Sequence, residues 1–326
     1  MNYHRSLLPH PSDGIMILKG SYIPPEVLTI AFRGSCFPVR ASFFREYLER
    51  FLGRKVILGS ESEKPDLLII EGKDLVDEEG YLLEVETPGC RLTATSWRGT
   101  FTGIQTYIQL VTSNRTLQCC RIADSPALSW RGLMLDVARS FCPLEELLGI
   151  IDIMALYKLN VLHWHISDDQ GWRFPVDGYP ALVSEERGYY SRNDINYVVA
   201  YAEKRNIMIV PEVDMPGHMI AALSAYPNLS CTGGSFVIPA GEGIFKDILC
   251  VGKADTIAFA KKVVDTLCSL FPSPYIHLGG DEIPLDRWTT CPDCQHRMQE
   301  LGYGEEKALL GWFCNEIAAY AREKGK

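Results

Sequence analysis

Apolar positions follow two different rhythms along the chain, and the change falls near residue 124. In the first part, short apolar runs alternate with two stretches of helical periodicity. The runs that predict strands are residues 14–20, 27–34, 55–60, 66–72 and a hairpin-like pair at 81–96, and the predicted helices are residues 41–53 and 103–112. We expect residues 1–124 to form a small α+β domain, with its helices on one face of an antiparallel sheet.

From residue 125 onwards, strands and helices alternate regularly. The predicted strands are residues 131–138, 160–167, 207–214 and 275–282, and the predicted helices are residues 144–159, 194–206, 255–271 and 306–326. Strands with few polar residues that alternate with amphipathic helices indicate a parallel sheet. Residues 125–326 are therefore predicted to form a second domain of the α/β class.

Each predicted strand of this second domain ends in polar, chemically capable residues. In chain order they are Asp136 and Arg139, Asp168 and Asp169, Asp214 and His218, and Asp281 and Glu282. Catalytic groups at the carboxyl ends of successive strands are the arrangement of a (β/α)8 TIM barrel. An open doubly wound sheet is the alternative, but no glycine-rich phosphate loop follows the first strand. Because a barrel needs eight βα units and four are visible, we expect about the first half of a barrel.

Composition and charge narrow the range of partners. The 326 residues carry a formal net charge of −9, and such a surface repels phosphate backbones, so we expect neither nucleic acid nor a membrane as partner. No apolar run approaches the ~18 residues of a transmembrane helix, and prolines interrupt the N-terminus before a signal peptide could form. Eleven cysteines without regular spacing favour reduced thiols, and we expect a cytoplasmic protein.

Asp281 and Glu282 stand side by side after two glycines, where the last strand ends. Neighbouring residues on a strand point to opposite faces, but Gly279 and Gly280 allow the backbone to turn, so both carboxylates can reach one pocket. Two close carboxylates do not ionise equally easily. An ionised group that stabilises positive charge and a protonated group that donates to a leaving group are the roles used in glycoside hydrolysis. The alternative is a solvated acidic pair in a loop.

His163 and His165 share one strand face and form a conceivable metal-binding pair. We favour hydrogen-bonded core histidines, because no third or fourth ligand stands at a fitting spacing. Asp168 is expected to face the pocket at the strand's end, whereas Asp169 could cap the following turn. Trp172 could offer a flat apolar face to a sugar ring, or it could be a structural tryptophan of the loop.

Asp214 and His218 flank a Pro-Gly turn that could bring both into one pocket. An Asp–His hydrogen bond fixes the imidazole tautomer and suits a polar substrate-binding network. The alternative is a turn that its own aspartate stabilises.

Cys291 and Cys294 form a C-x-x-C pair that His296 follows, which resembles half of a zinc site. A structural zinc ion needs four ligands, and the chain contains no second C-x-x-C, so we expect no metal. Redox chemistry is not expected either, because no thioredoxin-like context surrounds the pair.

Four motifs in chain order resemble the signature of family 20 glycoside hydrolases, the β-N-acetylhexosaminidases. They are "RGLMLDVARSF", "NVLHWHISDDQGWR", "VPEVDMPGH" and "HLGGDE". Upstream, "EEGYLLEV" and "GTFTGIQTYIQLV" are similar to the small α+β domain that precedes the barrel in this family. The resemblance spans nearly the whole chain.

The resemblance implies a retaining exo-β-N-acetylhexosaminidase that removes terminal GlcNAc or GalNAc. The 2-acetamido oxygen of the substrate is then the nucleophile and forms an oxazolinium intermediate, which is the substrate-assisted exception to carboxylate nucleophiles. Glu282 matches the general acid/base, and Asp281 matches the residue that orients the acetamido group. Arg131 matches the arginine that holds the sugar hydroxyls. The matches to the polar network lining the pocket are Asp168, Asp214 and His218. No metal or organic cofactor is implied.

The later strands of family members supply a tyrosine, tryptophans and an acidic residue that enclose the sugar. No residue after Lys326 supplies them here, so the resemblance implies a chain truncated after the fourth βα unit, and it does not imply activity of these residues alone. Two alternatives remain at this point. One is a metal-dependent, amidohydrolase-like barrel enzyme that uses His163 and His165, and the other is a non-catalytic incomplete barrel that binds sugar or associates with another chain.

Overall fold

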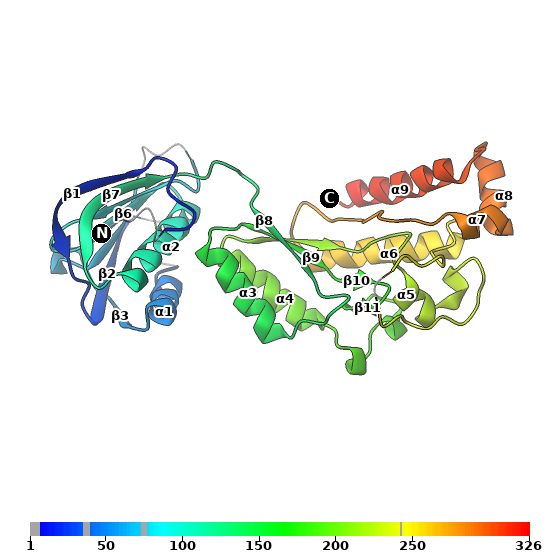
Figure 1. Cartoon of the computed structure of the whole chain (residues 1–326), viewed down its shortest axis with the longest axis horizontal. Coiled ribbons are helices and arrows are strands. Elements are labelled where there is room, and N and C mark those ends of the chain that lie inside the picture. Colours follow the sequence, from blue (N-terminus) through cyan, green and yellow to red (C-terminus); the bar gives the residue numbers. More distant parts are fainter. Residues whose placement is uncertain (1–6, 35–39, 73–76, 242) are drawn as a thin grey trace. The chain divides into compact units, whose positions relative to one another are not determined.

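The computed structural model divides the chain into two compact units (Figure 1). It describes residues 7–34, 40–72, 77–241 and 243–326. The first unit holds the described residues up to Arg131 together with Asp152–Asn160, and the second holds Gly132–Ile151 and Val161–Lys326. The first unit thus extends past residue 124 and includes a segment from farther along the chain. Among the described helices, none has the length and apolar character needed to span a bilayer.

A seven-stranded sheet forms the centre of the first unit, in the order β1-β7-β5-β6-β4-β2-β3. Its strands are β1 (Ile15–Tyr22), β2 (Val27–Arg33), β3 (Lys55–Leu58), β4 (Leu67–Glu71), β5 (Tyr81–Val85), β6 (Cys90–Ala94) and β7 (Leu117–Asp124). The pairs from β1 to β6 are antiparallel, whereas the pairs from β6 to β3 are parallel. The prediction of an antiparallel sheet is therefore wrong for half of it. Helix α1 (Ala41–Leu52) connects β2 to β3 and provides the crossover that a parallel pair requires.

Helices α1 and α2 (Trp97–Ser113) pack on this sheet and against each other. Ser96 caps α2, since its side chain accepts the backbone N–H groups of Arg98 and Gly99. The aromatic rings of Tyr47 on α1 and Phe101 on α2 lie 5.3 Å apart, and both side chains are buried. Aromatic contacts of this kind supply much of the apolar burial that holds helices on a sheet.

Residues Asp152–Asn160 are held on the first unit by polar contacts. Lys158 is buried, and its Nζ donates to Asp124 Oδ2 at 2.8 Å and to Tyr81 Oη at 2.9 Å. Gln109 on α2 donates from Nε2 to the carbonyl of Leu156 at 2.8 Å. Burial lowers the pKa of Lys158, and its contact with Asp124 opposes this effect.

The second unit is built on a parallel sheet with the order β12-β9-β8. Its strands are β8 (Gly132–Asp136), β9 (Val161–His165) and β12 (Met208–Glu212), and each pair is parallel and in register. The predicted fourth strand is reduced to one bridge, Glu212 to His277, continued by the bond from Met215 N–H to Leu278 O. Gly279 and Gly280 have φ values of 69° and 114°, so the backbone leaves the extended conformation at this point.

Helices follow the strands of the second unit in the βα order that the sequence predicted. They are α3 (Leu144–Leu156), α4 (Arg192–Glu203), α5 (Ile220–Ala225), α6 (Ala254–Leu270), α7 (Asp286–Thr290), α8 (Pro292–Leu301) and α9 (Glu306–Glu323). A two-residue hairpin of β10 (Ser167–Asp168) and β11 (Gly171–Trp172) lies just beyond β9. Helices α6 and α9 pack against each other, as Figure 1 shows in yellow and red. This arrangement matches the first strands and helices of a (β/α)8 barrel.

Candidate active site

The last residues of the parallel strands form one row across the sheet. Asp136 ends β8, His165 ends β9 and Glu212 ends β12, and each is the register partner of its neighbour. The bridge from Glu212 to His277 adds a fourth member to the row. Because side chains in register on parallel strands point to the same face, these four polar groups meet above one edge of the sheet.

Glu212 is buried among three imidazoles. Its Oε2 atom lies 2.7 Å from His163 Nε2 and 2.9 Å from His165 Nδ1, and its Oε1 lies 3.0 Å from His277 Nδ1. Burial raises the pKa of Glu212, but the three imidazoles outweigh this effect and hold its pKa below the ordinary value. Glu212 therefore places a fixed negative charge beneath the site. Sequence reasoning missed it, although a lone acid at the end of an apolar strand was an available signal.

Asp168 is buried and has three partners. Its Oδ2 is 2.9 Å from His165 Nε2 and 2.7 Å from Arg139 Nη2, and its Oδ1 is 3.1 Å from His218 Nδ1. Burial raises the pKa of Asp168, but the bonds to His165 and His218 more than offset this and lower it overall. In turn, Asp168 and Glu212 raise the pKa of His165 to about 9 against the opposing effect of burial.

His218 connects the buried acids to Glu282. Its Nδ1 faces Asp168 and also lies 3.2 Å from Asp169 Oδ2, while its Nε2 is 3.7 Å from Glu282 Oε2. Hydrogen bonds to the two aspartates raise the pKa of His218 to about 10. Asp169 Oδ1 also accepts the N–H of Ile220, so this residue secures the first turn of α5. This long-range bond differs from the expected cap of the turn that follows Asp169 in sequence, because Ile220 lies 51 residues further along the chain.

The two glycines bring the Asp281-Glu282 loop against Asp214. A Cβ atom on Gly279 would lie 2.0 Å from Asp214 Oδ1 and 2.4 Å from its Cα, so only glycine fits there. The N–H of Gly280 donates to Asp214 Oδ1 at 2.6 Å. Burial raises the pKa of Asp214 to about 6, although the Gly280 bond acts in the opposite direction.

Asp281 and Glu282 are both exposed at the surface of this cluster, and they have different neighbours. The carboxylate of Asp281 lies within 4.8 Å of those of Glu212 and Asp214. Glu282, whose side chain is 56% exposed, approaches His218 instead. Glu282 has a φ of 45°, a backbone conformation that is rare outside glycine and is often associated with functional sites. The turned backbone places both acids at one cluster, Asp281 near two other carboxylates and Glu282 near an imidazole.

The motifs of this site lie within a matched family region. Residues 128–326 match the model described as "Glycosyl hydrolase family 20, catalytic domain", and residues 5–125 match "Glycosyl hydrolase family 20, domain 2". The chain belongs to glycosyl hydrolase family 20. The match confirms the predicted family, with a small α+β domain before a catalytic domain of the (β/α)8 class.

Named relatives agree with this family assignment. A Beta-hexosaminidase of Akkermansia muciniphila is 32% identical, with 98% of this chain and 65% of that protein covered. A Beta-hexosaminidase of Porphyromonas gingivalis is 37% identical, with 76% of this chain and 35% of that protein covered. Two solved structures are also similar, and this chain covers only part of their length. The beta-N-acetylhexosaminidase of Bacteroides fragilis has a TM-score of 0.85 at 31% identity, with 99% of this chain and 65% of that one covered. The exo beta-N-acetylglucosaminidase of Vibrio harveyi, in complex with N-acetylglucosamine, has a TM-score of 0.86 at 30% identity, with 99% and 54% covered.

Five of the six site residues predicted for this family 20 chain lie in the cluster. They are Asp168, Asp214, His218, Asp281 and Glu282. Arg131 does not belong to it, because it precedes the amino end of β8, whereas the cluster lies at the carboxyl ends. Its guanidinium instead binds Glu79 and donates to the carbonyl of Lys158 at 2.7 Å.

The guanidinium that lies in this cluster belongs to Arg139, not to Arg131. It follows the carboxyl end of β8, where it contacts Asp136 at 2.5 Å and Asp168 at 2.7 Å. The sequence signal was its position after the strand, since catalytic groups of barrels follow the strands.

Trp172 is a core residue in this family 20 structure. It is buried, its Nε1 donates to the carbonyl of Phe174 at 2.8 Å, and its ring stacks on that of Phe174 at 5.1 Å. The interpretation of Trp172 as a platform for a sugar ring is therefore wrong. The ring has no open face to offer, because it also packs on Phe259.

The histidines considered as a metal pair contact acids instead. His163 and His165 both lie within ion-pair distance of Glu212. His165 is buried and hydrogen-bonded to Asp168, whereas His163 is partly exposed, so the expectation of a hydrogen-bonded core histidine holds for His165 alone. Among the described residues, the ligand atoms of His163, Glu212 and His277 are close enough together to hold an ion. Each of these imidazoles also lies within ion-pair distance of Glu212.

Proposed function

We propose that the protein is a retaining exo-β-N-acetylhexosaminidase that releases terminal N-acetylhexosamine from a glycan or glycoconjugate. The observation that carries this proposal is the turned loop after Gly279 and Gly280, which places Glu282 beside His218 and Asp281 beside Asp214. The names of the relatives support it, and so does the N-acetylglucosamine bound in the Vibrio harveyi structure.

Glu282 is the general acid in this proposal. It gives its proton to the glycosidic oxygen while the bond from that oxygen to C1 breaks, and the acetamido carbonyl oxygen of the substrate attacks C1 to form an oxazolinium ring. Glu282 then takes a proton from the water that attacks C1, the ring opens, and the sugar leaves with its configuration retained. The exposure of Glu282 suits exchange with both leaving group and water.

Asp281 stabilises the positive charge that develops on the acetamido group and orients its N–H. The neighbouring Asp214, with its pKa raised by burial to about 6, accepts the N–H of Gly280 and keeps this loop in place. The charge of Glu212 below adds to the negative potential at this position.

His218 and Arg139 position the remaining groups. His218 bonds the ionised Asp168 through Nδ1, so its Nε2 is oriented towards Glu282 and can donate to it when the carboxylate is charged. Arg139 is partly exposed while Asp168 is buried, so the guanidinium is the member of that pair available to sugar hydroxyls.

The test is the hydrolysis of 4-nitrophenyl N-acetyl-β-D-glucosaminide by wild type and by Glu282→Gln, on this chain and on any longer form of the protein. Loss of the general acid is expected to lower turnover by about 10²–10⁴-fold. The matched control is Glu300→Gln, because Glu300 lies on α8 and pairs with Arg297 away from the site.

Equal turnover by wild type and Glu282→Gln would refute the assignment. Cleavage of the matching 4-nitrophenyl β-D-glucoside at a similar rate would refute the substrate-assisted route, because that sugar has no acetamido group. A parallel assay with 4-nitrophenyl N-acetyl-β-D-galactosaminide measures the preference between the two sugars, which differ in configuration at C4.

A further inference from the structure

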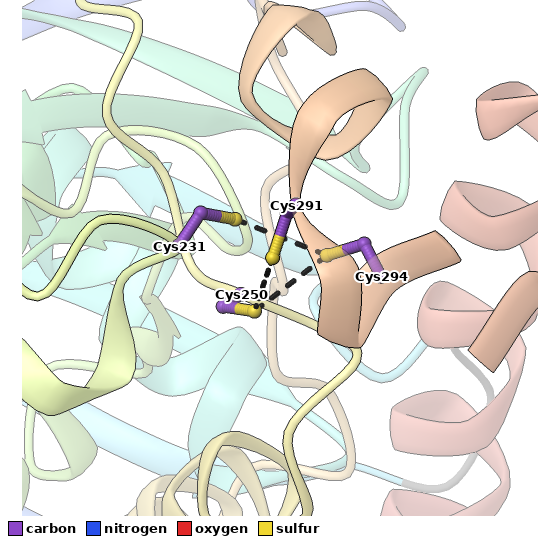
Figure 2. A group of neighbouring side chains, drawn as sticks. All are labelled: Cys231, Cys250, Cys291 and Cys294. Atoms are coloured by element: carbon purple, nitrogen blue, oxygen red, sulfur yellow. Dashed lines mark hydrogen bonds between the residues drawn. The ribbon is translucent and has the colours of Figure 1, made fainter. Parts of the chain in front are cut away.

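Four cysteines from three separate segments converge in the second unit (Figure 2). Cys231 follows a short turn after α5, Cys250 precedes α6, and Cys291 and Cys294 lie at the start of α8. Cys250 Sγ is 3.5 Å from Cys291 Sγ and 3.6 Å from Cys294 Sγ, and Cys231 Sγ is 3.8 Å from Cys294 Sγ. All four are free thiols.

We propose that Cys231, Cys250, Cys291 and Cys294 bind one zinc ion in a tetrahedral thiolate site. With Zn–S bonds of about 2.3 Å, tetrahedral geometry places the sulfur atoms about 3.8 Å apart. The three distances of 3.5 to 3.8 Å fit this spacing, whereas a disulfide brings its sulfur atoms to about 2.05 Å. Four cysteine ligands are the set of a closed structural zinc site.

The backbone holds the segments of Cys231 and Cys250 together without help from a metal. Ser230 and Leu249 form an antiparallel bridge, and the N–H of Cys250 donates to the carbonyl of Leu229 at 2.8 Å. The ammonium of Lys253 donates to the carbonyl of Ser230 at 2.7 Å.

The start of α8 packs closely against the segment that carries Cys250. A Cβ atom on Gly252 would lie 2.2 Å from the carbonyl carbon of Asp293 and 2.4 Å from the nitrogen of Cys294, so only glycine allows this approach. Trp288, fully buried just before Cys291, donates from Nε1 to the carbonyl of Leu249 at 2.9 Å. Three of the four sulfur ligands are consequently buried and held at fixed positions.

The surrounding charges suit four thiolates around a dication, a group with a net charge of about −2. The positive charge of Lys253 acts on Cys250, and the N-terminal end of α8, a ten-residue helix, faces Cys291 and Cys294. His296 is not a ligand in this structure, because it is exposed and pairs with Glu300.

From the sequence we expected no metal site, because only one C-x-x-C pair is present. The missing ligands are single cysteines that the fold brings in from two other loops. The site differs from the proposed catalytic centre in both residues and chemistry, so its test does not depend on glycosidase activity. Its structural role is to fasten α8, which follows the Asp281-Glu282 loop, to the loops before α6.

The first experiment measures metal by inductively coupled plasma mass spectrometry on the chain purified without added zinc. About one zinc per chain is expected for wild type, and a loss of at least about fivefold for Cys250→Ser/Cys294→Ser, since two of four ligands are removed. Cys314→Ser is the matched control, because that thiol is exposed on α9 and should keep its zinc.

A second measurement on wild type keeps the test independent of folding defects in the variants. The metal-free chain is titrated with zinc while thiol reactivity is followed, and about four thiols should become protected at one equivalent. Cobalt(II) added instead should give the intense visible bands and thiolate charge-transfer absorption of tetrahedral sulfur ligation. Absence of co-purified zinc together with no protection would overturn the proposal. Disulfides among these cysteines in the native chain, or stoichiometric iron in place of zinc, would overturn it as well.

Discussion

Gly279→Ala tests whether the approach of the Asp281-Glu282 loop to Asp214 is as tight as the structure indicates. The substitution adds one methyl group just after the bridge between Glu212 and His277. That methyl carbon would lie 2.0 Å from Asp214 Oδ1 and 2.4 Å from Asp214 Cα, and the second of these is a backbone atom that cannot rotate away. The loop carrying Asp281 and Glu282 therefore has to move.

Two terms make up the expected loss of stability. The φ of 69° at Gly279 is a left-handed conformation that costs an alanine about 1–2 kcal/mol. The clash with Asp214 adds an overpacking term of about 1–3 kcal/mol. Gly302→Ala separates the two, because Gly302 has a φ of 72° and, apart from its neighbours in the chain, none of the described residues has a heavy atom within 4 Å of its added Cβ. Gly302→Ala should lose only the first amount.

Urea unfolding of wild type, Gly279→Ala and Gly302→Ala gives the free energy of unfolding of each. We expect Gly279→Ala to be less stable than Gly302→Ala by about 1–3 kcal/mol, which is the clash alone. Hydrolysis of the 4-nitrophenyl substrate should fall in Gly279→Ala and not in Gly302→Ala. Equal losses of stability in the two variants would show that the contact of Gly279 with Asp214 is not tight, and the account of this loop would fail.

Two further predictions concern buried charges. Because the pKa of Asp214 is raised to about 6 in the folded protein, above its ordinary value of 3.8, the folded state binds the proton more tightly. As pH rises from about 4 to about 6, the free energy of unfolding of wild type should therefore fall by roughly 3 kcal/mol or less relative to that of Asp214→Asn, measured by urea unfolding at each pH. If the difference between the two proteins did not change with pH, the prediction would be wrong. Lys158→Met removes the ammonium that pairs with the mostly buried carboxylate of Asp124, and it should cost about 3–5 kcal/mol in the unfolding of the first unit. Lys55→Met, at an exposed position of β3, should change little, and similar effects of the two substitutions would disprove the role of Lys158.

The alternation of strands and helices was visible in the sequence because each element has its own local period. The site residues were visible for a related reason, since Asp168, Asp214, His218 and the Asp281-Glu282 pair all follow strands that end at one edge. Their positions after successive strands were sufficient to predict that these side chains lie close together. Arg131 and Arg139 flank opposite ends of β8. The direction of this strand could therefore have indicated that Arg139, and not Arg131, lies at the carboxyl end, where the cluster forms.

Contacts between distant segments could not be read in this way. The role of Glu212 depends on the register that aligns it with His165 and His277, and no local pattern fixes register between strands that are far apart in sequence. The mixed sheet of the first unit also depends on which strands pair. Single cysteines such as Cys231 and Cys250 carry no motif of their own, so their convergence with the C-x-x-C pair appears only in three dimensions.

The contribution of Asp152–Asn160 to the first unit affects the order in which the protein can fold during synthesis. Residues up to Arg131 emerge from the ribosome first, but the mostly buried carboxylate of Asp124 gains its ammonium partner only after Lys158 has been synthesised. At about 5–20 residues per second, the delay amounts to roughly a few seconds. If residues 1–131 were expressed alone, Asp124 would never meet Lys158. A separately expressed first unit therefore needs the 152–160 peptide supplied with it to form the Asp124–Lys158 ion pair.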